Sequence, residues 1–539
     1  MTAGAVLRPC LLALLLVSAP LSADAQATAT PAPAAAVAPS TSSAPKPTAA
    51  EPTAADLAQS AAVLDASDPE TGTKGKPAED APDDVFEITW STLVTASGGE
   101  PETNLQLDDS GWRVEDLLRP RGNKLYPSTS VSLYGEVSAT DWLLFRGLLD
   151  TREIRDGATL EPPLDGLTMN GNSAADELGS GAALRELAVL IGSDALSIEL
   201  GRFRADVAEG LVYEDFGAGL RVRADFDAMD VAPLTAELLL STVGQRGQDA
   251  DNNQLVALRV DYRLSAFEYL GAFMAVSNDQ SGEVSEVLRS AYAENLLGNQ
   301  DALSSLFLQD TGSGGHGYLG ALAQITTADD AVLRLRLALS GGKLKLRVPL
   351  ETVTTPEQQL DGRTITIDVG GLAADAELRY GLSDTLELAG FAFLLSGDRP
   401  PDQDGVRYRS FIGLAPYWVW SGLFFSGGLT QGLYPNRATA AGVNGRGVVG
   451  LGPALSFDNE LIEAELRAVL LGAAADPPPA PLGGDSRAYG TELDWHGEWR
   501  ALPFMRVGAE LDVFFPGAFF PSRRVAYLTL VMVSLTNVP

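Results

Sequence analysis

The sequence predicts an all-β protein: a transmembrane antiparallel up-and-down β-barrel of about 18–20 strands with a disordered N-terminal leader. Three observations predict it. Runs of about ten residues alternate polar and apolar side chains, as strands with two different faces do. These runs come in pairs joined by short turns, and longer polar connections separate the pairs. After Val17 no apolar segment approaches the length of a membrane-spanning helix.

The N-terminus has the pattern of a secretory signal peptide. Arg8 precedes the apolar run LLALLLV, and small residues follow, with alanines at positions 23 and 25 of an A-x-A-like cleavage site. We therefore predict a signal peptide over residues 1–25. Cys10 is the only cysteine and precedes the apolar run, so the mature chain is expected to have no disulfide, cysteine metal site or cysteine nucleophile.

Residues 26–84 form the predicted leader. This segment is rich in Ala, Pro, Thr and Ser, and it cannot bury enough apolar area to offset the entropy of its chain. We expect a disordered segment in the periplasm. A plain spacer and a segment that contacts the cell wall are both compatible with this composition.

Residues 85–539 are the predicted outer-membrane barrel. Its hairpins include SVSLYGEVS–ATD–WLLFRGLLD, LRELAVLI–GSD–ALSIELGRF and AADAELRY–GLSD–TLELAGFAFLL. Asp, Asn, Gly and Ser at the joins favour tight turns. The connections between hairpins, such as 156–181, 278–315 and 397–406, are longer and polar. Alternation of short turns and long loops is typical of outer-membrane barrels, with turns in the periplasm and loops outside the cell.

The parity of the strands predicts which face is wet. In YGTELDWHGEW, which begins at Tyr489, acidic residues and a histidine alternate with Leu and Trp. In VLRLRLALS the leucines oppose Arg334 and Arg336. A soluble sandwich also alternates, but the charges on its outer face need no partner of opposite sign. Here acids and bases mix on nearly every polar face, which favours a lumen crossed by salt bridges and an apolar face toward lipid, with tryptophans near the interface.

The charged residues on the polar faces are the candidate pore lining. For each of them the alternative is a salt bridge in the wall with no role in transport. The predicted basic array is Arg221, Arg223, Arg259, Arg263, Arg334 and Arg336, and the predicted acidic array is Glu463, Glu465, Glu492, Asp494, Glu510 and Asp512, with His496 beside it.

One stretch has helical rather than strand periodicity. In the segment 281–310, Val284, Val287, Leu288 and Tyr292 recur at the spacing of one helix face. The segment lies in a long connection between hairpins. It predicts either a helical surface loop or a helix folded into the pore as a constriction.

Three segments together resemble the alginate-export family of outer-membrane β-barrels. They are LSIELGRFRADVAEGLVYEDF (196–216), LLSGDRPPDQDGVRYRSFIGLA (394–415) and GTELDWHGEWRALPFMRVGAELDVFFPG (490–517). The second matches the family's S-G-D, acidic loop and aromatic strand. The resemblance covers under a fifth of the chain, and it implies a monomeric barrel of about eighteen strands that passes a polysaccharide or small solutes.

The chain departs from that family in three respects. Phe203 follows Gly201-Arg202 where the family has an amide side chain, and the chain ends at Pro539 without the terminal aromatic residue that barrel-assembly machinery reads. The formal charge is −33, of which residues 1–120, with 17 acidic and 6 basic residues, carry −11 and the rest −22. Because the family's lumen is strongly basic, alginate is not carried over as the substrate.

The sequence does not predict an enzyme. It has two histidines, His316 and His496, with no spacing typical of a metal site or of a Ser–His pair. Carboxylate pairs such as Glu492 and Asp494 resemble those of glycosidases on paper, but on one strand face they are the ordinary charges of a lumen. We expect no cofactor and no metal. The leader is also too short for the folded plug of a TonB-gated receptor.

The predicted function is that of an outer-membrane channel that passes a polysaccharide or small hydrophilic solutes through a charged lumen. The alternative is a structural or adhesive outer-membrane barrel without transport activity. The acidic balance argues against nucleic acid as a partner. We expect a monomer in the bacterial outer membrane, in contact with its lipid and assembled by the barrel-assembly machinery, with the leader in the periplasm.

Overall fold

The computed structural model describes most of the predicted barrel. The predicted signal peptide and nearly all of the predicted leader lie outside the described residues. These are 84–98, 124–150, 183–243, 253–280, 284, 287–288, 313–327, 331–348, 363–399, 407–418, 420–422, 438–477, 484–520 and 525–536.

Eighteen long strands form the wall in the part of the chain that the structure describes. The first nine are β1 (Asp84–Gly98), β2 (Lys124–Thr140), β3 (Leu143–Asp150), β4 (Ala183–Gly192), β5 (Leu196–Val207), β6 (Tyr213–Asp225), β7 (Leu234–Thr242), β8 (Gln254–Arg263) and β9 (Tyr269–Asp279). The other nine are β10 (Ser313–Thr326), β11 (Val332–Val348), β12 (Arg363–Ser383), β13 (Leu386–Leu395), β17 (Val448–Asp458), β18 (Ile462–Gly472), β19 (Ala488–Leu502), β20 (Met505–Pro516) and β21 (Ala526–Thr536).

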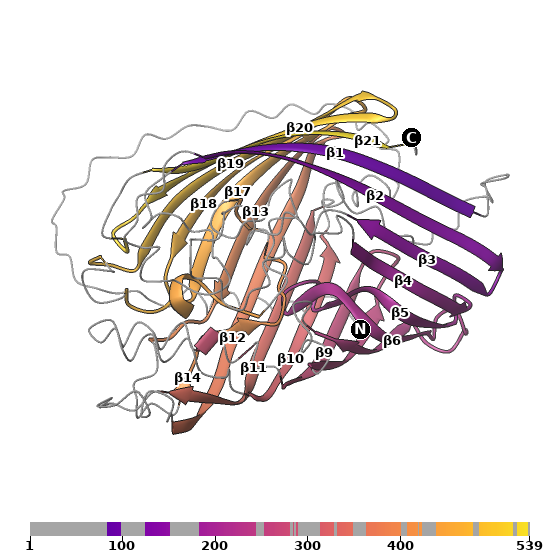
Figure 1. Cartoon of the computed structure of the whole chain (residues 1–539), viewed down its shortest axis with the longest axis horizontal. Helices are drawn as coiled ribbons and strands as arrows, with labels where there is room; N and C mark the ends of the chain where they lie inside the picture. Colours follow the sequence, from indigo (N-terminus) through magenta and orange to yellow (C-terminus); the bar gives the residue numbers. More distant parts are fainter. Residues whose placement is uncertain are drawn as a thin grey trace, which may run out of the picture. The chain divides into compact units, whose positions relative to one another are not determined.

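The wall closes on itself. Each long strand pairs antiparallel with the next along the chain, with β13 passing directly to β17. The first and last strands complete the ring, because β1 pairs antiparallel with β21 from Thr89↔Thr536 to Gly98↔Tyr527. Figure 1 shows β1 beside the yellow C-terminal strands. The predicted all-β antiparallel barrel of about 18–20 strands is therefore confirmed.

The outer face of the wall is apolar. Along β9, Leu270, Met274 and Val276 are 41%, 50% and 53% exposed, while Phe273 and Ala275 between them are buried. A water-soluble fold places its large apolar side chains inside, so a continuous apolar outer face needs another apolar medium. Among the described residues, no helix has the length and apolarity needed to span a bilayer.

The strand that begins near Tyr489 has the predicted parity. Trp495 and Trp499 point outward and are 41% and 53% exposed, whereas Glu492 and Glu498 are buried inside. The predicted separation of an apolar outer face from an acidic inner face is confirmed for this strand.

The two ends of the barrel differ in the length of their connections. At one end neighbouring strands are joined by turns such as 193–195, 384–385 and 503–504. At the other end the connections include 99–123 and 396–447. The predicted alternation of short turns and long loops is confirmed. The connection between β5 and β6 is an exception, because it has only residues 208–212 yet lies at the long-loop end.

The aromatic segment within 394–415 is not the wall strand that the resemblance implied. Its described part contains only two-residue strands and the segment FIGLAPYW, which runs inside the barrel. A wall strand must alternate polar and apolar side chains, whereas this segment is apolar at successive positions and becomes buried on every side. The short elements are β14 (Arg407–Tyr408), β15 (Ile412–Gly413), β16 (Thr439–Ala440) and the 3₁₀ helix η9 (Val443–Gly445).

The predicted helical segment 281–310 is described at three positions only. Val284, Val287 and Leu288 are helical, and Val284 and Leu288 are buried against the interior core. The Asp279 carboxylate accepts a hydrogen bond of 3.1 Å from the N–H of Val284. The rest of the segment lies outside the described residues, so its role as a constriction stays a prediction.

Candidate pore and its lining

A charged cavity of about 600 Å³ lies inside the barrel. Its lining, among the residues that the structure describes, contains nine arginines and eleven aspartates and glutamates, a formal charge of −2. Five of the six predicted basic residues line it: Arg221, Arg223, Arg259, Arg334 and Arg336. The cavity therefore has nearly balanced charge, although residues 121–539 carry −22.

Most arginines of the cavity form ion pairs across the wall. Arg221 lies 2.9 Å from Glu199 and 3.7 Å from Glu237, on neighbouring strands. Its guanidinium also lies 4.8 Å above the ring of Phe203, the residue that departs from the family signature. Arg223 differs: it is exposed in the cavity, and the described residues include no ion-pair partner for it.

Glu209, in the short connection between β5 and β6, reaches across the cavity. Its carboxylate accepts a hydrogen bond of 2.9 Å from Nε of Arg334 and one of 3.3 Å from Arg259, and a third from the hydroxyl of Tyr269. Its backbone carbonyl accepts a hydrogen bond from Arg336. Burial opposes ionisation of this carboxyl, but Arg334 and Arg259 outweigh it and lower the pKa of Glu209 to about 2.

The backbone around Glu209 is held in an unusual conformation. Ala208, Glu209 and Gly210 have φ of 59°, 51° and 78°, so two side-chain-bearing residues lie in the left-handed region. The Asp206 carboxylate accepts a hydrogen bond of 3.1 Å from the N–H of Glu209. Residues in this region each cost about 1–3 kcal/mol and persist where their surroundings fix them. This turn directs Glu209 into the lumen.

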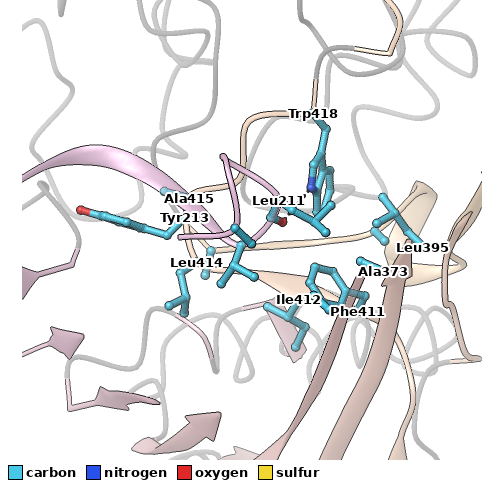
Figure 2. Close-up of a cluster of buried hydrophobic side chains, with 14 of the residues drawn as sticks. Leu211, Tyr213, Ala373, Leu395, Phe411, Ile412, Leu414, Ala415 and Trp418 are labelled. Atoms are coloured by element: carbon cyan, nitrogen blue, oxygen red, sulfur yellow. Dashed lines mark hydrogen bonds between the residues drawn. The ribbon is translucent and has the colours of Figure 1, made fainter. Parts of the chain in front are cut away.

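A dry cluster adjoins the cavity. Phe411, Ile412, Leu414 and Trp418 of the long connection 396–447 pack on Leu211 of the short one, and each is at most 2% exposed. We call these five residues the loop cluster. Figure 2 shows them together, with Ala373 and Leu395 contributed by the wall strands β12 and β13.

Main-chain hydrogen bonds fasten the two connections to each other. Leu414 donates to the carbonyl of Val212 at 2.8 Å, and Tyr417 donates to that of Gly210 at 2.7 Å. The indole N–H of Trp418 donates to the carbonyl of Leu211 at 3.1 Å. On the wall, the Tyr318 hydroxyl donates to the carbonyl of Ile412 at 2.8 Å. The long connection is thus held inside the barrel and narrows its interior.

Most of the predicted acidic array faces inward but does not line the described cavity. Glu492, Asp494, Glu510 and Asp512 are buried, and Asp494 lies directly opposite Asp512 in the register of β19 and β20. Gly422 of the long connection lies against Asp512, since a β-carbon added to Gly422 would come within 2.5 Å of that carboxyl. The inward connection therefore covers this acidic patch.

The remaining predicted residues lie at separate places along the wall. Glu465 lines the cavity and lies 2.5 Å from Arg467, with the half-buried His496 opposite it in the register. Glu463 pairs with an arginine of β19 at 2.7 Å, and Arg263 pairs with an aspartate of β6 at 2.8 Å. Neither Glu463 nor Arg263 lines the described cavity. A role in transport for any of the thirteen residues stays a prediction.

Sequence reasoning missed the residues that come from the connections and those opposite the arginines. Glu209 carried no signal beyond a charged residue before a glycine, and Trp420 and Phe391, which line the cavity, read as ordinary apolar positions. Asp375 was detectable in principle, because it lies on the polar face of β12 and pairs with Arg336 at 2.6 Å. His316, considered as a catalytic candidate, is buried and stacked on the ring of Tyr318 at 4.7 Å.

The eighteen-stranded closed wall with a charged interior has the architecture of a porin-like outer-membrane barrel. No family model matches the chain, and no curated protein matches it in sequence. Solved structures from Pseudomonas aeruginosa are similar at low identity. OccK11 (OpdR) is 11% identical with a TM-score of 0.44 over 84% of this chain and 96% of that one. The outer-membrane protein OpdK is 10% identical with a TM-score of 0.44 over 84% and 98%. OccK2 (OpdF), solved with glucuronate, is 11% identical with a TM-score of 0.43 over 85% and 99%.

Proposed function

We propose that this chain is an outer-membrane channel that passes small hydrophilic solutes through a charged lumen. One observation carries the proposal: the wall is a closed ring of strands whose large apolar side chains point outward and whose charged side chains surround an internal cavity. A bilayer covers such an outer face, and the closed ring leaves no unpaired strand edge in the lipid.

The arrangement of the connections supports an orientation. In outer-membrane barrels short turns face the periplasm and long loops face outward. The leader precedes β1, whose first residue Asp84 lies at the short-turn end. A periplasmic leader and short turns on the same side agree with each other, and we place the long connections outside the cell.

The cavity favours small solutes over a polymer. The connections 208–212 and 396–447 meet inside the barrel and are fastened by main-chain hydrogen bonds, which leaves a cavity of about 600 Å³. Its nine arginines are matched by eleven carboxylates, so it lacks the excess of positive charge that a long polyanion needs. We keep polysaccharide export only as the less supported alternative. A purely structural barrel is less supported too, because side chains would fill the interior of such a barrel and leave no charged cavity.

Conductance of the refolded barrel in a planar bilayer tests the proposal. We expect stable single-channel conductance with a weak preference for cations, since the lining carries a formal charge of −2. Heat-denatured protein at the same concentration is the control. A chain that stays soluble without detergent, or a refolded barrel that never conducts, would contradict the proposal.

A further inference from the structure

Glu209 is a carboxylate partner of two arginines that line the cavity, Arg334 and Arg259. Arg334 forms its ion pair with Glu209 and with no other acid that the structure describes. Arg259 divides its contacts between Glu209 at 3.3 Å and Asp261 at 2.8 Å. Loss of the Glu209 carboxylate leaves Arg334 unpaired and Arg259 half-paired inside the lumen.

The Glu209 side chain is not what holds its connection in place. The main chain of residues 208–214 is fastened to the long connection by the hydrogen bonds from Leu414 and Tyr417. The Trp418 indole adds a third contact, and Leu211 anchors the turn in the loop cluster. A wall salt bridge that serves only stability does not require a strained turn with φ of 51° at the charged residue itself.

We propose that Glu209 sets the charge selectivity of the pore. Its tethered carboxylate occupies the site that Arg259 and Arg334 offer to an anion, and it keeps that site closed to free anions. This inference rests on the proposed channel function. The Glu209 side chain is 16% exposed, and its carboxylate is held by two guanidinium groups and a phenol. A small carboxylate solute would meet the same donors in its place.

Reversal potentials in a KCl gradient across a planar bilayer test the inference. The test variant is Glu209→Gln, and the matched control is Glu237→Gln, which removes the same charge from the same cavity. Among the described residues Glu237 forms an ion pair only with Arg221, at 3.7 Å, and Arg221 keeps its 2.9 Å partner Glu199. We expect the ratio of chloride to potassium permeability to rise about threefold or more in Glu209→Gln, and by less than about 1.5-fold in the control.

The variant Glu209→Asp distinguishes two effects of Glu209: occupation of the site between Arg259 and Arg334, and the negative charge that it adds to the cavity. It keeps the charge but is one methylene shorter, so it cannot contact both arginines at once. We expect a chloride permeability between those of the wild type and Glu209→Gln. Heat-dependent migration on a gel verifies that each variant forms a closed barrel. If Glu209→Gln does not form a closed barrel, the double variant Glu209→Gln/Arg334→Gln takes its place. The double variant removes both charges of the ion pair and should return the selectivity toward that of the wild type.

The outcomes separate the inference from the proposed function. Conducting variants in which Glu209→Gln and Glu237→Gln shift the selectivity equally would overturn the role of Glu209 and leave the channel standing. A folded wild type and folded variants that all fail to conduct would overturn the channel itself, and the role of Glu209 with it.

Discussion

The interior of this barrel has two neighbouring regions that are built on opposite principles. The cavity is lined by nine arginines and eleven carboxylates that neutralise one another. The loop cluster next to it is dry, and its five apolar residues are at most 2% exposed. The wall strands surround both regions. The connections 208–212 and 396–447 form the boundary between the charged cavity and the dry loop cluster. Selectivity therefore depends on residues of the connections as much as on the strands.

Truncation in the loop cluster should have the largest effect on this boundary. In Phe411→Ala, a fully buried ring that contacts Tyr318 and Trp418 is lost. We expect the free energy of unfolding to fall by about 3–5 kcal/mol, as for other buried aromatic residues. The long connection should also loosen, so the single-channel conductance should rise. Urea unfolding in detergent and planar-bilayer recording measure the two effects.

The matched control for that variant is Phe515→Ala on the outer face. Phe515 is 44% exposed, so its truncation leaves the interior unchanged. We expect a smaller loss of stability and an unchanged conductance. Equal conductance in Phe411→Ala and the wild type would show that the loop cluster does not narrow the pore.

Acidification should affect the cavity and not the loop cluster. The pKa of Glu209 is lowered from 4.5 to about 2, so its ion pairs add stability that is fully present above about pH 4.5 and is lost as the pH falls toward 2. The shift corresponds to on the order of 3 kcal/mol. The other ten carboxylates of the cavity are common to the wild type and Glu209→Gln, so the two proteins are compared at each pH. We expect the chloride permeability of the wild type to remain below that of Glu209→Gln at pH 4, and the two values to converge only near pH 2. Convergence near pH 4.5 would contradict the pairing.

The two faces of each strand could be predicted from the sequence, because successive side chains of a strand point to opposite faces. The alternation of acids with Leu493, Trp495 and Trp499 assigns the side chains from Glu492 to Trp499 to the two faces of β19, and the structure agrees. Arg334 and Arg336 were placed in the lumen by the same reasoning, and both line the cavity.

The connections could not be predicted in this way, because their conformation depends on contacts distant in sequence. FIGLAPYW reads as a strand by its composition, yet it is held by Val212, Gly210 and Tyr318 from other parts of the chain. Glu209 depends on three successive residues with positive φ, of which two are not glycine. No local sequence pattern predicts the inward course of FIGLAPYW or the turn that carries Glu209. The charged residues of the wall strands were therefore predicted, whereas Glu209, which pairs with two of them, was not.

A smaller effect is expected where the wall supports the long connection. Gly371 of β12 lies against Phe411, and a β-carbon added there would come 2.5 Å from Cα and 2.7 Å from N of Phe411. We expect Gly371→Ala to cost about 1–3 kcal/mol through overpacking. The same substitution at Gly390, where an added β-carbon meets nothing within 4 Å, should be neutral or stabilising by up to about 1 kcal/mol. Comparable melting temperatures for the two variants would mean that the connection 396–447 does not pack closely against β12.

The smallest effect on stability and selectivity is expected for a solvent-exposed cluster of one carboxylate and two arginines. Asp476, outside the wall strands, binds Arg399 and Arg487 much as Glu209 binds two arginines, and hydrogen bonds from both lower its pKa. However, Asp476 is 41% exposed and Arg399 is 70% exposed, so solvent and salt screen the attraction. We expect Asp476→Asn to change the free energy of unfolding by less than about 1 kcal/mol, and by still less in 1 M salt. Selectivity should not change at all. A shift in reversal potential as large as that of Glu209→Gln would show that exposed charge outside the cavity, rather than occupancy of the arginines inside it, controls which ions pass.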